Sequence, residues 1–149
     1  MLKRIFLTVS LVLVTALCSA AWQGESDIPR HHDGPPPRGE KLAAILTPDQ
    51  IKAQGFMLPQ QIKAYELAAK VPNTLYQMPC YCRCDRSVGH ESLRSCFESA
   101  HGAHCSTCMQ EAIFAYQQQK AGKSVKQIRA AIERGDFQQV DLNQVASIR

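Results

Sequence analysis

The sequence lacks the patterns that identify several common classes of protein. Apolar and polar residues nowhere alternate over a strand-length run, so no β-sheet is expected. Thioredoxin-like redox enzymes place their Cys-x-x-Cys motif near a βαβ unit, and the missing strands count against that fold. The acidic residues are dispersed, and no motif surrounds Ser92 or Ser95 as it would surround the nucleophile of a hydrolase. The sequence therefore does not predict an enzyme.

Strong net charge is also missing. The chain carries 17 Lys and Arg residues against 13 Asp and Glu residues, which gives a net charge of +4. Removal of residues 1–21, a candidate signal peptide, would leave 15 basic and 13 acidic residues and a net charge of +2. This excess is too small to favour nucleic acid or an anionic membrane surface as a partner.

A long apolar span is absent as well. The uncharged stretch 5–17 is well short of the ~20 residues that a membrane-spanning helix needs. Lys3 and Arg4 precede it, and the small residues 19–21 follow it, which is typical of a signal peptide over residues 1–21. We therefore expect an exported protein that is periplasmic or associated with the cell envelope. It would touch the membrane only through its N-terminal segment, if that segment is not cleaved.

Cys18 offers a possible lipid attachment point in the same segment. A lipid-modified cysteine normally follows a small residue, whereas Cys18 follows Leu17. Cleavage after Ala20 or Ala21 is therefore favoured, and it would discard Cys18 and leave six cysteines. Six is an even number, which allows three disulfides in an oxidising compartment.

The remainder of the chain divides into a linker and a domain. Residues 22–46 are rich in Pro, Gly and charged residues and hold few apolar groups, so they are predicted to form a flexible Pro-rich linker. The adjacent His31 and His32 in this linker are interpreted as solvated polar residues. Residues 47–149 are predicted to form a small all-α domain, rich in cysteine.

Capping residues and apolar periodicity place the helices of this domain. Thr47 is a candidate N-cap with Pro48 in the first turn, and Ser124 is a candidate N-cap for the last helix. Helices are expected over about 48–54, 59–70, 90–100, 105–120 and 125–134. The apolar content is thin, and small domains of this kind often need a metal or disulfides. We expect a cysteine-rich loop to dock on two helix ends.

The chemistry is concentrated between positions 80 and 108, which hold six cysteines and three histidines: Cys80, Cys82, Cys84, Cys96, Cys105, Cys108, His90, His101 and His104. In an extended segment the first three thiols would share one face at spacings of roughly 6.6 Å. That is wide for one tetrahedral ion with metal–sulfur bonds of about 2.3 Å. The spacing favours either a multi-metal thiolate site or a loop that curls.

Two later segments supply further candidate ligands. Cys96 shares an apolar helical stripe with Leu93 and so points inward. Cys105 and Cys108 fall in a first helical turn, where both sulfurs aim at one point and the helix N-terminus favours thiolates. We expect the strongest ligands to be Cys82, Cys84, Cys105 and Cys108. The full predicted set is Cys80, Cys82, Cys84, Cys96, Cys105, Cys108, His90 and His101, and the thioethers of Met78 and Met109 add soft donors to the pool.

These residues carry a resemblance to a known family. Pro79-Cys80-Tyr81-Cys82-Arg83-Cys84, then Gly89-His90, Ser92, Cys96-Phe97, His101, Cys105-Ser106-Thr107-Cys108, Gly122 and Ile128-Arg129 resemble the bacterial PCYCGC-motif family of exported proteins and lipoproteins. The resemblance covers roughly residues 70 to 135. It implies a secreted or envelope-anchored protein, with copper binding by the CYCxC segment as the suggested activity. Arg83 stands where the family has glycine, the residue that takes a positive φ freely.

Three functions remain open from the sequence. The first is capture, buffering or delivery of copper outside the cytosol, because soft thiolates select Cu(I). Its partners would be metal ions and a copper-handling protein. The second is a partner-binding domain stabilised by zinc or by disulfides. The third is a thiol–disulfide oxidoreductase that uses Cys105 and Cys108, which the missing strands disfavour.

Overall fold

The computed structural model describes residues 27–148, and within this range the protein is helical with no β-strand. The all-α prediction is therefore confirmed. The predicted signal peptide, Cys18 and the first residues of the predicted linker lie outside the described residues. Within residues 27–148, no helix combines the length and the apolar character that crossing a membrane requires.

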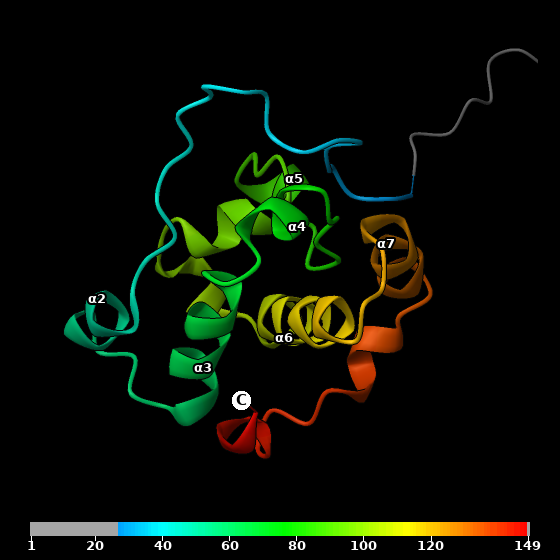
Figure 1. Cartoon of the computed structure of the whole chain (residues 1–149). Coiled ribbons are helices and arrows are strands. Elements are labelled where there is room, and N and C mark those ends of the chain that lie inside the picture. The colour runs from blue at the N-terminus through cyan, green and yellow to red at the C-terminus, as the bar shows by residue number, and fades with distance from the viewer. Residues whose placement is uncertain (1–26, 149) are drawn as a thin grey trace, which may run out of the picture.

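The described residues contain six α-helices and four short 3-10 helices. In chain order they are α2 (Pro48–Ala53), α3 (Pro59–Ala68), α4 (Pro72–Tyr76), α5 (Cys84–Ser87), η1 (Leu93–Phe97), η2 (Ala100–His104), α6 (Ser106–Lys120), α7 (Val125–Glu133), η3 (Asp136–Gln139) and η4 (Val145–Ser147). Figure 1 shows α6 in the middle of the molecule, with α3 on one side and α7 on the other, and both pack against it.

Helix starts follow the capping residues that the sequence displays. The Thr47 side chain accepts a hydrogen bond from the backbone N–H of Gln50, and the Gln50 side chain accepts one from the Thr47 N–H. Ser124 and Gln127 form the same reciprocal pair at the start of α7. Because each pair satisfies two backbone donors that a helix leaves unpaired, these starts could be placed from sequence.

The segment between positions 90 and 104 differs from the single helix and turn that were expected. It forms two 3-10 helices, η1 and η2, separated by an extended residue, Ser99. The Ser99 side chain accepts the N–H of His101, and its carbonyl accepts the hydroxyl of Tyr65 at 2.6 Å. The break is thus stabilised by a tertiary hydrogen bond from α3, which helical periodicity cannot reveal.

The core lies between α3, α6 and α7 and reaches the cysteine loop. Tyr65, Leu67, Ile113, Ile128 and Ile132 are fully buried in it. Four of the cysteines are also buried in this core, so the sulfur-rich region is part of the packed interior rather than an exposed appendage.

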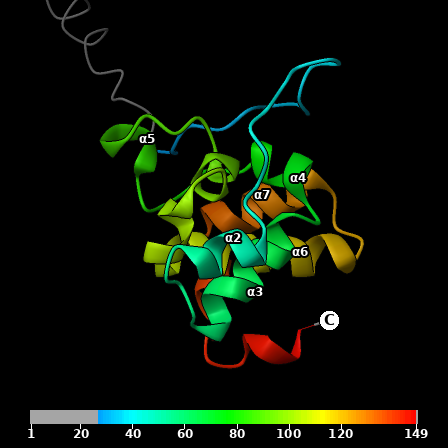
Figure 2. The same ribbon diagram turned by 90° about the vertical axis from the view of Figure 1, so that its left-hand side faces the viewer.

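Residues 27–46, predicted as a flexible linker, contain no helix but lie against the domain. In Figures 1 and 2 this blue-to-cyan segment passes over α4 and α5 before it reaches α2. His32 stacks on Tyr76 with ring centroids 3.8 Å apart, and buried Arg94 donates to the carbonyl of Ala43 at 2.8 Å. The segment is therefore held by specific contacts with the core of the domain.

Candidate metal centre

Five cysteine sulfurs converge on one point beside the start of α6. The Sγ atoms of Cys80, Cys82, Cys84, Cys96 and Cys108 all lie within 4.8 Å of one another. Cys108 Sγ is 3.4 Å from both Cys80 Sγ and Cys82 Sγ, and Cys84 Sγ is 3.5 Å from Cys96 Sγ. Sulfurs on a tetrahedral ion with 2.3 Å bonds are separated by about 3.8 Å, so this packing has the scale of a metal-ligand shell.

A second group of ligand atoms overlaps the first. It consists of Cys84, His90, Cys96 and His101, whose donor atoms also lie within 4.8 Å of one another. His101 Nε2 is 3.2 Å from Cys84 Sγ, and His90 Nδ1 is 3.3 Å from Cys96 Sγ. Both imidazoles are half-buried, whereas the two sulfurs are buried. The second group therefore offers two soft and two borderline donors at the edge of the sulfur cluster.

The triple-cysteine segment curls into a turn, which is one of the two alternatives that the sequence left open. The Arg83 N–H donates to the Cys80 carbonyl at 3.1 Å, and Arg83 adopts a left-handed conformation with φ of 62°. The turn shortens the Sγ separation of Cys80 and Cys82 to 3.3 Å. Arg83 thus takes the positive φ at the position where the motif of the resembling family has glycine.

Glu111 on α6 holds this turn through a side-chain hydrogen bond, and it was not among the residues predicted from the sequence. Its Oε1 accepts the backbone N–H of Tyr81 at 2.7 Å. The side chain is fully buried, and its Oε2 atom has no hydrogen-bond partner among the described residues. Burial raises the pKa of the Glu111 carboxyl well above its ordinary value. Its three-residue spacing from Cys108 on a helix is the signal that could have identified it.

Other elements orient the remaining candidate ligands. The Cys84 carbonyl accepts the N–H of His90 at 3.2 Å, which ties that histidine to the turn. Cys96 lies on η1, His101 on η2 and Cys108 in the first turn of α6. Four separate segments thus supply the two groups.

The cysteines are in two states. Cys82 and Cys84 are paired as a disulfide, and the other cysteines among residues 27–148 are free: Cys80, Cys96, Cys105 and Cys108. Three disulfides, the arrangement that six cysteines allow, are therefore not formed among the described residues. Because metal ligands are thiolates, reduction of the Cys82–Cys84 pair is needed before both sulfurs can bind an ion.

Contact between sulfurs stabilises negative charge in the cluster. Hydrogen bonding from Cys108, and then from Cys96, lowers the pKa of the Cys80 thiol to about 3. The same contacts, with Cys105 first and Cys80 next, raise the pKa of Cys108. Burial and then the nearby His101 lower the pKa of His90, so its ring is neutral and able to bind metal at pH 7. The contacts with Cys108 and Cys96 thus favour the thiolate form of Cys80.

Cys105 is the predicted site residue that falls outside both groups. It is half-buried and occupies the N-cap position of α6, while the other seven predicted residues are brought together. Contact with Cys108 lowers the pKa of Cys105 to about 6. Exposed His104 also lies outside both groups, with its ring edge against Phe56. The role of all these residues as ligands stays a prediction.

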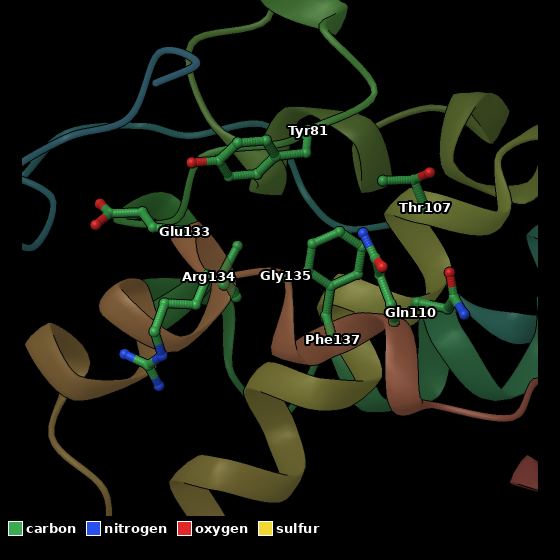
Figure 3. A pocket seen from close by; sticks show the side chains of 9 residues that line it. Tyr81, Thr107, Gln110, Glu133, Arg134, Gly135 and Phe137 are labelled. Carbon is green, nitrogen blue, oxygen red and sulfur yellow. The ribbon is translucent and has the colours of Figure 1, made fainter. Parts of the chain in front are cut away.

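A pocket lies on the outer side of the turn. It has a volume of about 560 Å³ and is lined by residues that include Tyr81, Thr107, Arg134 and Phe137. Figure 3 shows Tyr81 on one side of this pocket and Phe137 beneath it, and their rings stack with centroids 6.4 Å apart. None of the clustered cysteines lines it, so the pocket and the candidate metal centre are separate features.

Comparison with known proteins gives one match. No curated protein and no solved structure matches the chain. A family model described as a protein of unknown function with PCYCGC motif matches residues 7–139. This range contains Pro79 to Cys84, both ligand groups and most of the described helices. The chain therefore belongs to the family of proteins of unknown function with the PCYCGC motif.

Proposed function

We propose that the protein is exported and binds copper as Cu(I) through its clustered thiolates, for capture, buffering or delivery outside the cytosol. The observation that carries the proposal is the convergence of five cysteine sulfurs within 4.8 Å of one another, four of them buried. Thiolates are soft ligands and select Cu(I) over harder ions. A thiolate on Cys80 at neutral pH supplies the negative charge that a monovalent cation needs.

Zinc in a structural role is the second candidate. The group of Cys84, His90, Cys96 and His101 has the two-cysteine, two-histidine composition of structural zinc sites. On this view the ion would hold the turn, η1 and η2 together, and the domain would serve to bind a partner. Copper is favoured over this candidate because the additional thiols of Cys80, Cys82 and Cys108 exceed the four ligands of a closed zinc site.

The proposal is of a binding protein rather than of an enzyme. The Cys105–Cys108 pair begins α6 directly after a 3-10 helix, whereas redox enzymes with this spacing place it in a βαβ unit.

The half-buried side chains of Cys82, His90 and His101 form the outer edge of the centre. We propose that copper is exchanged with a copper-handling partner protein across this edge.

Native mass spectrometry of the fully reduced protein, titrated anaerobically with Cu(I) or Zn(II), tests the proposal. We expect Cu(I) to bind, to be retained against a Cu(I)-specific chelator and to displace Zn(II). The Cys80→Ser/Cys108→Ser variant should lose Cu(I) affinity, since it removes two of the sulfurs in closest contact. Retention of Zn(II) in the presence of equimolar Cu(I) would favour the structural zinc site, and failure to take up Cu(I) would overturn the proposal.

A further inference from the structure

We infer that the centre holds two metal ions that share Cys84 and Cys96 as bridging ligands. The inference rests on the proposed metal-binding function and assigns the ligands of each ion. Its starting point is that the two groups of mutually close donor atoms have these two cysteines in common.

The positions of the imidazoles place a second ion beside the first. His101 Nε2 approaches Cys84 Sγ at 3.2 Å, and His90 Nδ1 approaches Cys96 Sγ at 3.3 Å, so each histidine faces one shared sulfur. The two imidazole rings meet edge to face with centroids 4.8 Å apart. Neither histidine belongs to the five-sulfur group. An ion held by both imidazoles and both shared sulfurs therefore leaves the remaining thiols available for another ion.

The remaining thiols complete the second ligand set. Cys80 Sγ lies 4.0 Å from Cys84 Sγ and 3.8 Å from Cys96 Sγ, and Cys108 Sγ lies 3.4 Å from Cys80 Sγ. One ion would thus be bound by His90, His101 and the shared pair, and the other by Cys80, Cys108 and the shared pair. Two four-coordinate ions need eight ligand positions, and these six residues fill them because two sulfurs bridge.

Cys82 remains as a half-buried additional donor at the rim, 3.3 Å from Cys80 Sγ. Its disulfide with Cys84 must be opened before loading. A dithiol reductant supplies two electrons and two protons to the Cys82–Cys84 bond, giving two thiols, and is itself oxidised to a disulfide. Each thiol that then binds an ion releases its proton.

Bridging also fits the burial of the shared pair. Cys84 and Cys96 are buried, whereas His90 and His101 are half-exposed. A buried thiolate without a partner is costly because burial penalises charge. A thiolate that contacts two cations has its charge compensated from both sides, so bridging suits buried sulfurs such as these two.

The test is the Cu(I) stoichiometry of the reduced full chain by native mass spectrometry. We expect two Cu(I) ions per wild-type chain and one in the His90→Ala/His101→Ala variant, whose half-exposed substitutions leave the core intact. The Cys84→Ser/Cys96→Ser variant should bind neither ion tightly. A matched control outside both groups, the exposed His104→Ala, should retain two ions.

X-ray absorption on the wild-type two-copper form gives a readout that does not depend on folding of the variants. We expect copper–copper scattering and imidazole scattering together, and absence of the copper–copper scattering would contradict the bridging. One ion per wild-type chain, three or more ions, or two ions retained without the histidines would overturn the shared-ligand assignment while leaving copper binding in place. Absence of any Cu(I) uptake would instead overturn the proposed function.

Discussion

At the scale of single residues, Arg83 has a backbone conformation that most residues avoid. Its φ of 62° lies in the left-handed region, which costs a residue with a Cβ roughly 1 kcal/mol relative to glycine. The side chain compensates in part, because it pairs with Asp27 at 2.7 Å and lies over the Tyr81 ring. Partly exposed pairs of this kind contribute about 0–1 kcal/mol.

Two substitutions at Arg83 should therefore distinguish the contribution of the left-handed turn to stability from that of the ion pair. Arg83→Gly should change the free energy of unfolding by no more than about 1 kcal/mol, since relief of the backbone cost offsets loss of the pair. Arg83→Val should destabilise the turn and lower Cu(I) uptake, because a β-branched residue resists positive φ. Urea unfolding measures the free energy of unfolding of each variant, and copper titration measures its Cu(I) uptake. Equal behaviour of the two variants would show that the left-handed turn is not required.

Glu111 is the second residue whose role can be isolated. Glu111→Ala should destabilise the reduced metal-free protein by about 1–3 kcal/mol, because the half-buried Tyr81 N–H loses its acceptor. Glu111→Gln keeps an acceptor oxygen of nearly the same shape and should lose less. Chemical denaturation of both variants makes the comparison. A loss as large for Gln as for Ala would contradict the assignment of the stabilising effect to this hydrogen bond.

At the scale of elements, the contact between η1 and η2 is unusually close. A Cβ at Gly102 would lie 3.0 Å from the Cys96 carbonyl oxygen and 3.2 Å from the Tyr65 hydroxyl. Gly102→Ala should therefore cost about 1–3 kcal/mol of stability, as overpacking does. It should also weaken metal binding, because it would move Cys96 on η1 away from His101 on η2. Gly34→Ala is the control, since nothing lies within 4 Å of its added Cβ. Thermal unfolding and copper titration of both variants make the comparison. Equal stability and equal copper affinity of Gly102→Ala and Gly34→Ala would contradict this account.

The first turn of α6 makes Cys105 reactive. Its pKa of about 6 means that most of it is thiolate at pH 7. It is half-buried while Cys80, Cys84, Cys96 and Cys108 are buried, and Cys82, which is also half-buried, is held in the disulfide with Cys84. We expect iodoacetamide to alkylate Cys105 first in the metal-free protein. The rate should rise as pH passes through about 6 and level off above it, since deprotonation creates the nucleophile. Peptide mapping by mass spectrometry checks this, and faster labelling of Cys96 would contradict it.

The elements that sequence could predict are those fixed by local chemistry. Thr47 and Ser124 begin helices because their side chains cap the nearest backbone donors. Helix α6 could be predicted because its apolar residues recur every three or four positions. The division of the 90–104 region into η1 and η2 depends on the Tyr65 hydroxyl, which arrives from a distant helix. The curl of the triple-cysteine turn likewise depends on Glu111, some thirty residues away.

At the scale of the whole molecule, Arg129 on α7 joins three parts of the chain. Its guanidinium donates to the carbonyls of Gln77 and His32, each at 2.9 Å, and to the Asp33 carboxylate at 3.0 Å. Arg129→Ala should lower the free energy of unfolding by about 2 kcal/mol and increase proteolysis within residues 27–46. The exposed Arg134→Ala is the matched control. Unchanged proteolysis would mean that other contacts suffice to hold the segment.

The candidate site was predicted as a set of residues but not as a geometry. Residue chemistry alone identified seven side chains that the structure brings together. Sequence could not show that Cys105 belongs to neither donor group, because its place depends on the N-cap backbone at the start of α6. Nor could it show that two donor groups overlap at Cys84 and Cys96, since that depends on how η1 packs against the turn.

The origin of the donor atoms in four separated segments has a consequence for how long the protein survives. If an ion binds as proposed, it would cross-link those segments, so a chain that lacks one would open more often and offer cleavable backbone to proteases. A stability difference of only about 1–2 kcal/mol changes the steady-state amount of a protein several-fold. The abundance of this protein would then rise and fall with copper supply, without any change in its rate of synthesis.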